Sequence, residues 1–181
     1  MELVEEFKIK NLPKRKRIGI VLMSCAVMIF AIEIGRYLPR LSIQDVGFIN
    51  WSIMVVAVLI FVVVIHEGLH GLFFWLFSRK VKFGFRLKGS MGPAFWTSSP
   101  GSLIPRLRFQ IVGLAPQILT VMMLLLLLTP MPTILKYGLL WAVVFNLGGG
   151  GLDIFGVIYL RRYPRSCLVE DTEDGMRIYK G

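Results

Sequence analysis

Four long apolar stretches constrain the fold of this 181-residue chain more than any other feature of its sequence. They cover residues 18–35, 51–77, 109–129 and 137–160. A helix needs about 20 apolar residues to cross a bilayer, and each stretch approaches or exceeds that length. The stretches are too long and continuous for the strands of about ten residues that build a membrane barrel. We therefore expect an all-α membrane protein, a bundle of four transmembrane helices.

The composition excludes a soluble globular domain and a disordered chain. Hydrophobic residues make up 55% of the sequence and charged residues only 18%, and the mean hydropathy is +0.68. The two cysteines, Cys25 and Cys167, are too few for a disulfide framework or a cysteine metal cluster. The net charge of +10 is spread between the apolar stretches instead of forming one patch. The expected partner of this charge is therefore the lipid bilayer and not a nucleic acid.

The basic residues also predict the orientation in the membrane. Of the 21 Lys and Arg residues, 18 lie in the N-terminal segment, the loop 78–108 and the tail 161–181. Because cytoplasmic loops are enriched in Lys and Arg, both termini and this loop are expected in the cytoplasm. The first stretch lacks a small-x-small cleavage site, which favours a retained helix over a signal peptide. The sequence therefore predicts a multi-pass protein of the cell membrane, with one domain over residues 1–181.

Two segments outside the apolar stretches carry a pattern. Residues 81–87 alternate apolar and basic or small side chains, which predicts a short strand or hairpin at the membrane interface. A basic loop lying on anionic head groups is the alternative. The tail contains four acidic residues and is expected to be a solvated terminus, although it could instead pair with the basic loop and gate the site; these residues are Glu170, Asp171, Glu173 and Asp174.

Ionisable residues inside the second apolar stretch mark a candidate metal site. His66, Glu67 and His70 form an H-E-x-x-H motif, and they include both histidines of the chain. On a helix, a spacing of four places the two imidazoles on one face, where they can share a zinc ion with the glutamate beside them. Two buried histidines bonded to other helices are the alternative. Such a triplet would be costly in hydrocarbon without a compensating ion, which favours the metal.

Asp153 is the expected third ligand, since a catalytic zinc usually keeps three protein ligands and one open position. His70 lies nine residues before Arg79, and Asp153 lies eight residues before Arg161. At 1.5 Å per residue, both therefore lie about 12–14 Å from the cytoplasmic helix ends. Pairing with an arginine, or capping of the helix after the glycines, is the alternative role for this carboxylate.

Four glycines, residues 148–151, stand just before Asp153. They weaken a spanning helix and permit irregular structure where it lines protein or a watery cavity. Asn146 precedes them and could donate a hydrogen bond to an oxyanion or hold the substrate backbone. An ordinary interhelical hydrogen bond is an equally good interpretation of Asn146.

At these residues the chain resembles the membrane-embedded zinc metalloproteases of the site-2 protease type. More narrowly, it is similar to the bacterial family called "putative zincin peptidase", which consists of small four-helix proteins. The resemblance rests on segments 66–74, 80–85, 114–116, 146–153 and 162–175. The chain departs from the site-2 pattern in having glycines for prolines between Asn146 and Asp153, a spacing one residue shorter, and Ile154 after the aspartate.

The leading expectation is an intramembrane zinc metalloprotease that hydrolyses peptide bonds of a membrane protein or peptide substrate near the cytoplasmic leaflet. His66, His70 and Asp153 would be ligands of Zn²⁺, and Glu67 and Asn146 would be catalytic. One alternative is a zinc transporter or sensor, although the first and third stretches offer almost no ionisable groups for a transport path. Another is a degenerate protease that acts as a scaffold, which would not need Glu67.

Overall fold

A computed structural model describes residues 2–8, 11–36, 46–87, 94–172 and 175–181, without some side chains of the first helix. The chain divides into two compact units whose segments alternate along the sequence. The first unit contains residues 1–19, 67–115 and 152–181, and the second contains residues 20–66 and 116–151. The prediction of a single domain over the whole chain stays a prediction.

The helices follow the apolar stretches. They are α1 (Lys14–Gly35), α3 (Phe48–Ser78), α4 (Arg106–Leu114), α5 (Pro116–Leu127), α6 (Thr133–Gly149) and α7 (Gly151–Leu160). Among the described residues, two spans are long and apolar enough to cross a membrane, namely α3 and residues 106–127. A third is added if α6 and α7, bent by 42°, count as one span. The first predicted span lies in α1, where several side chains are not described, so the bundle of four stays a prediction.

Two of the predicted helices are broken, and this corrects the boundaries 109–129 and 137–160. The third stretch is interrupted at Ala115, between α4 and α5. Pro116 follows this break, and its lack of a backbone N–H suits it to the first position of a new helix. The fourth stretch is interrupted at Gly150 (φ −73°, ψ 4°), between α6 and α7. The expectation of irregular structure at the glycines is confirmed.

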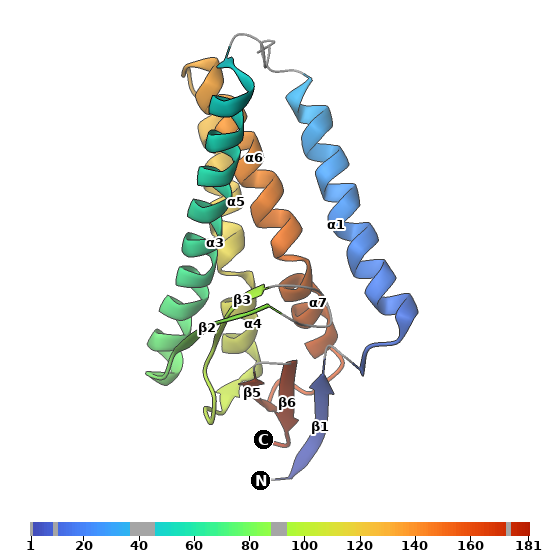
Figure 1. Ribbon diagram of the computed structural model, residues 1–181. Helices are drawn as coiled ribbons and strands as arrows, with labels where there is room; N and C mark the ends of the chain where they lie inside the picture. Colours follow the sequence, from blue (N-terminus) through green and yellow to red (C-terminus); the bar gives the residue numbers. More distant parts are fainter. Residues whose placement is uncertain (1, 9–10, 37–45, 88–93, 173–174) are drawn as a thin grey trace. The chain divides into compact units, whose positions relative to one another are not determined.

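Both ends of the chain belong to a four-stranded antiparallel sheet in the first unit, so the protein is mostly helical, as predicted, but not all-α (Figure 1). The sheet order is β1-β6-β5-β4. The strands are β1 (Leu3–Lys8), β4 (Ile104–Pro105), β5 (Leu168–Thr172) and β6 (Gly175–Tyr179). Val169 of β5 lies opposite Ile178 of β6, and both side chains are fully buried. These strands are short and half polar, so they lack the long apolar runs from which the helices could be predicted.

The acidic tail is part of this sheet, which corrects the expectation of a solvated terminus. Glu170 is half-buried on β5. Its Oε2 accepts a hydrogen bond from the Tyr179 hydroxyl at 2.8 Å, and its Oε1 accepts one from the Gly101 backbone N–H at 3.0 Å. Asp171 follows on the same strand, whereas Glu173 and Asp174 lie outside the described residues. The segment is therefore structural, because it joins β6 to the loop before β4.

A second sheet, the hairpin of β2 (Lys82–Arg86) and β3 (Ala94–Ser98), confirms the strand predicted over residues 81–87. Phe83 pairs with Thr97 and Phe85 with Phe95, so these four side chains share one face. The ring of Phe83 lies against Gly71 of α3, where an added Cβ would be only 2.5 Å from it. Gly71 therefore allows the hairpin to lie directly on the helix, one residue after His70.

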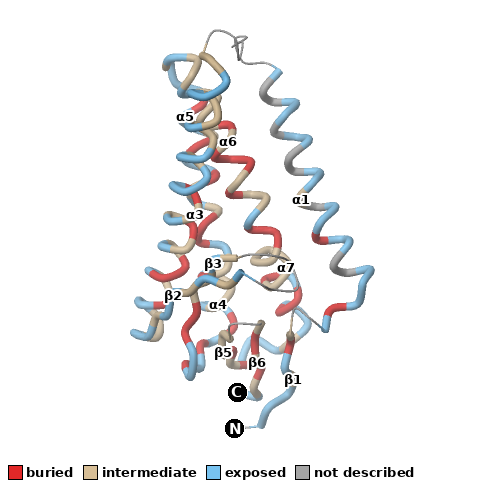
Figure 2. Tube along the Cα trace, viewed as in Figure 1, coloured by how far each residue is buried: buried red, intermediate tan, exposed pale blue. Residues whose placement is uncertain are grey.

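The core of the second unit is formed by α3, α5 and α6. One cluster of buried residues in this core consists of Val62, Met123, Ala142 and Val143. Exposed segments recur along α3 (Figure 2), and they include large apolar residues such as Ile53, Ile60 and Val64. A helix that is apolar all around is typical of a membrane span, because lipid solvates the side chains that protein does not cover. The helix ends before Arg79, whose positive φ of 60° turns the chain toward the hairpin.

Candidate metal centre

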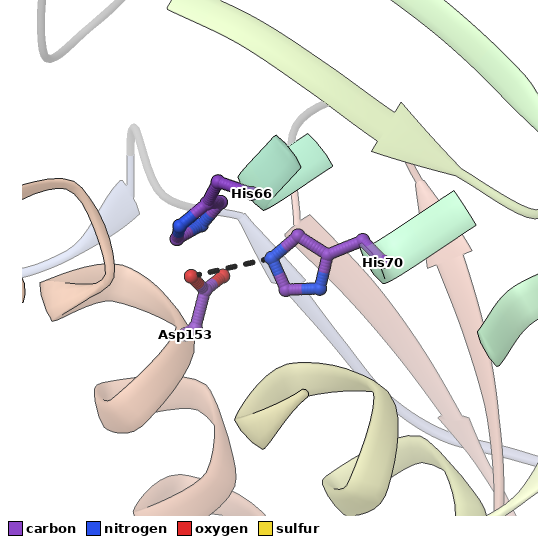
Figure 3. Close-up of side chains that lie close together, drawn as sticks. All are labelled: His66, His70 and Asp153. Carbon is purple, nitrogen blue, oxygen red and sulfur yellow. Dashed lines mark ion pairs between the residues drawn. The ribbon is translucent and has the colours of Figure 1, made fainter. Parts of the chain in front are cut away.

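His66, His70 and Asp153 lie together, and their ligand atoms are all within 4.8 Å of one another (Figure 3). The two histidines are one turn apart on α3, which is unbroken across the junction of the units at residues 66 and 67. Asp153 lies in the first turn of α7, directly after the break at Gly150. Both imidazoles are buried and the carboxylate is half-buried. Among the described residues, this is the cluster of histidine, cysteine and acidic side chains that could hold a metal ion.

The hydrogen bond of His70 determines which of its nitrogens faces the cluster. Nδ1 lies 2.9 Å from the backbone carbonyl oxygen of Val112. A carbonyl oxygen can only accept, so Nδ1 carries the hydrogen, and Nε2 of a neutral ring presents a lone pair. This Nε2 lies 3.4 Å from Oδ2 of Asp153. A lone pair facing a carboxylate requires a cation or a second proton between them.

His66 is oriented in the same way by Asn146. Nδ1 of His66 lies 3.0 Å from Oδ1 of Asn146. The identity of that oxygen follows from the other end of the amide, since Nδ2 donates to the Pro116 carbonyl at 2.9 Å. Nδ1 of His66 is therefore the donor, and Nε2 is the ring nitrogen that could bind a metal. Bonds of this kind from the second nitrogen are usual for histidines that bind metals, because they hold the ring and the tautomer.

Asn146 itself has no hydrogen left to donate. It is fully buried. Its Nδ2 donates to the Thr120 hydroxyl at 2.7 Å as well as to Pro116. A primary amide has two N–H hydrogens, and both are thus used. These contacts favour the interhelical hydrogen bond over the oxyanion role as the interpretation of Asn146.

Glu67 has a partner that the sequence analysis did not single out. The hydroxyl of Thr97, on β3, lies 2.7 Å from Oε2 of Glu67 and 3.1 Å from the backbone oxygen of the same residue. The single hydroxyl hydrogen serves the closer, charged acceptor best. Nothing in the sequence marks Thr97, because its contact with Glu67 depends on how the hairpin packs on α3.

Asp171 on β5 is a second residue of the site region that the sequence analysis missed. Burial raises the pKa of its carboxyl well above the usual value, and the neighbouring Asp153 and Glu67 raise it further, against the opposing effects of His70 and a Ser99 backbone N–H. Asp171 is therefore near enough to Asp153, Glu67 and His70 to be affected by their charges. The sequence analysis had assigned Asp171 to a solvated tail.

The donor set fits zinc. Two imidazole nitrogens and one carboxylate oxygen form a ligand combination common in catalytic zinc sites, with one coordination position left open. Bonds of about 2.0–2.2 Å in a tetrahedral geometry place ligand atoms about 3.4 Å apart. The separation of His70 Nε2 and Asp153 Oδ2 is 3.4 Å. The residues present are therefore suited in type to this ion, and His70 and Asp153 are also suited in spacing.

Comparison with known proteins identifies a family for this chain. The sequence model of the family described as "Putative zincin peptidase" matches residues 59–168, which is more than half of the chain. The matched region includes His66, Glu67, His70, Asn146 and Asp153. No curated protein and no solved structure matches the chain.

Proposed function

The chain belongs to the zincin peptidase family, and on that premise we propose that it is an intramembrane zinc metalloprotease. The observation that carries the proposal is the cluster of His66, His70 and Asp153, whose ligand atoms lie within 4.8 Å of one another. Nδ1 of each imidazole has its own hydrogen-bond partner, so the two Nε2 atoms would be the ligand atoms. The narrower resemblance to site-2 proteases stays a prediction.

His66, His70 and Asp153 would hold the zinc ion. When bound, zinc acts as a Lewis acid that polarises a carbonyl and makes water a nucleophile near neutral pH. Glu67 lies between the two histidines in sequence and would accept the proton of the attacking water and pass it to the leaving amine. Thr97 would hold the carboxylate of Glu67 in place, because its hydroxyl donates to Oε2 at 2.7 Å. This division of roles suits hydrolysis of a peptide bond.

The substrate would be a membrane protein or peptide cleaved near the cytoplasmic leaflet. Its segment must be extended at the site, since a helix buries its carbonyl oxygens in its own hydrogen bonds. Thr97 stands on β3, which pairs with β2 and with no other strand among the described residues. The other edge of β3 is a place where an unwound segment could add as a strand and form main-chain hydrogen bonds independent of sequence.

The test uses protein purified in detergent, loaded with zinc and given a model membrane peptide. The wild-type protein should cleave the peptide, and cleavage should stop when a chelator removes the metal. Glu67→Gln keeps the size of the side chain and an acceptor for Thr97, but it removes the base, so it should bind zinc and not cleave. Glu2→Gln, at an exposed glutamate in the first unit, is the matched control and should cleave as wild type does.

Two outcomes would reject the proposal. One is cleavage by Glu67→Gln at the wild-type rate. The other is zinc flux into proteoliposomes without any cleavage, which would support the transporter instead.

A further inference from the structure

A buried amide nitrogen beside the metal centre has no hydrogen-bond partner among the described residues. It is Nε2 of Gln117, in the first turn of α5. Most buried polar atoms in proteins are paired, so an unpaired donor needs an explanation. Gln117 and His66 belong to the same compact unit of the chain.

The orientation of the Gln117 amide follows from a chain of hydrogen bonds that begins at His66. Asn146 accepts from His66 Nδ1 and donates to the Thr120 hydroxyl at 2.7 Å. The Thr120 hydroxyl must then use its own hydrogen elsewhere, and it donates to Oε1 of Gln117 at 3.3 Å. Since Oε1 faces Thr120, Nε2 is on the other side of the amide. The N–H groups of Gln117 Nε2 therefore point away from Thr120.

Gly150 shows what Nε2 faces. A Cβ added to Gly150 would lie 2.5 Å from Gln117 Nε2 and 3.6 Å from His66 Cε1. The backbone at Gly150 does not require glycine, because its φ is −73° and its ψ is 4°. Because Gly150 has no side chain, the space beside it stays open. The Gln117 amide and the His66 ring both lie next to this space. In the ring, Cε1 is bonded to Nε2, the nitrogen left for the metal.

We propose that Nε2 of Gln117 donates a hydrogen bond to the carbonyl oxygen of the scissile peptide bond, on which negative charge develops during hydrolysis. The inference rests on the proposed function. The group is a donor, it is buried, and it is already oriented, which are the properties that make hydrogen bonds to a developing oxyanion effective. Gln117 thereby takes the role that the sequence suggested for Asn146, whose two amide hydrogens are already used.

The first measurement is turnover. Gln117→Met has a similar length and no N–H, so it should lower kcat by about 10²–10³-fold with little change in KM and with wild-type zinc content. Asn50→Met is the matched control, because it removes an exposed amide that donates to the Val46 carbonyl on the same protein. It should leave kcat unchanged. An unchanged kcat in Gln117→Met, or loss of zinc from it, would overturn the inference.

The second measurement does not need turnover. Acetohydroxamate is a small chelating oxyanion, and its binding to cobalt-loaded protein can be followed in the visible spectrum. Gln117→Met should weaken this binding by about 10–100-fold, the effect of losing one hydrogen bond to a charged group. Equal affinity of the variant and the wild type for acetohydroxamate would contradict the inference.

The two proposals fail in different ways. If wild type binds cobalt and acetohydroxamate but cleaves nothing, the proposed function fails and the role of Gln117 at a scissile bond fails with it; the binding measurement then decides whether Gln117 donates to an anion at the metal. If wild type binds no metal, both proposals are wrong. If wild type and Gln117→Met cleave equally well, only the role of Gln117 is wrong.

Discussion

The hydroxyl of Thr97 donates a hydrogen bond to the Glu67 carboxylate over 2.7 Å. Thr97 stands on β3 and Glu67 on α3, 30 residues apart in sequence. The contact exists because Gly71 lets the hairpin lie against the helix through the ring of Phe83. The hairpin thus contributes the side chain of Thr97 to the candidate site. This side chain holds the carboxylate of Glu67, which we propose as the general base.

Thr97→Val should lower kcat by about 10–100-fold, because a hydrogen bond to a charged group contributes about 1.5–3 kcal/mol and about 1.4 kcal/mol corresponds to a factor of ten in rate. Zinc content, measured by elemental analysis, should stay at the wild-type level. Thr97→Ser keeps the hydroxyl and should recover most of the rate. Equal rates for the Val and Ser variants would show that the hydrogen bond does not serve catalysis.

Asn146→Leu should weaken zinc binding by about 10–100-fold, since partners of the metal-binding histidines typically contribute that much to affinity. The reason is that His66 would lose the acceptor that orients its ring. Competition with a chromophoric chelator measures the affinity, and Asn50→Leu serves as the control. If zinc affinity were unchanged while kcat fell, Asn146 would be the direct donor that the sequence suggested.

Gly150→Ala should displace the Gln117 amide, because the new methyl group would lie 2.5 Å from Nε2. We expect a fall in kcat of about tenfold or more and weaker acetohydroxamate binding. Gly149→Ala, one residue earlier, meets nothing within 4 Å. It should keep its activity and stabilise the helix by up to about 1 kcal/mol. Full activity of Gly150→Ala would mean that the space beside His66 is not used.

Ile178→Ala should destabilise the first unit by about 2–5 kcal/mol, the usual cost of truncating a buried aliphatic side chain. Ile178 is fully buried on β6, opposite Val169. Thermal unfolding in detergent measures the effect, and Lys180→Ala, at an exposed position, should stay within about 0.5 kcal/mol of wild type. If Ile178→Ala lowered the free energy of unfolding no more than the control does, the C-terminal hairpin would not be part of a cooperative core.

The parts of the fold that were predicted correctly depend on local patterns. The hydrophobic runs predict α3 almost to its ends, and alternation over residues 81–87 predicts β2. The four-stranded sheet was missed because β1 pairs with β6 across nearly the whole chain. Neither strand carries a strong signal of its own, and pairing between distant segments cannot be inferred from one local window.

The sequence by itself determined which residues could bind a metal. On any helix the i, i+4 spacing of His66 and His70 puts both rings on one face, and a carboxylate within an apolar stretch, such as that of Asp153, needs a partner. Only the tertiary structure decided how each group is used. The contacts of Thr97 with Glu67, of Asn146 with His66, and of Gln117 with the space at Gly150 join residues between 30 and 80 positions apart in the sequence. The last two also depend on which end of an amide points toward its neighbour. Such orientations follow from packing and from the complete pairing of buried donors and acceptors, which the order of residues alone does not specify.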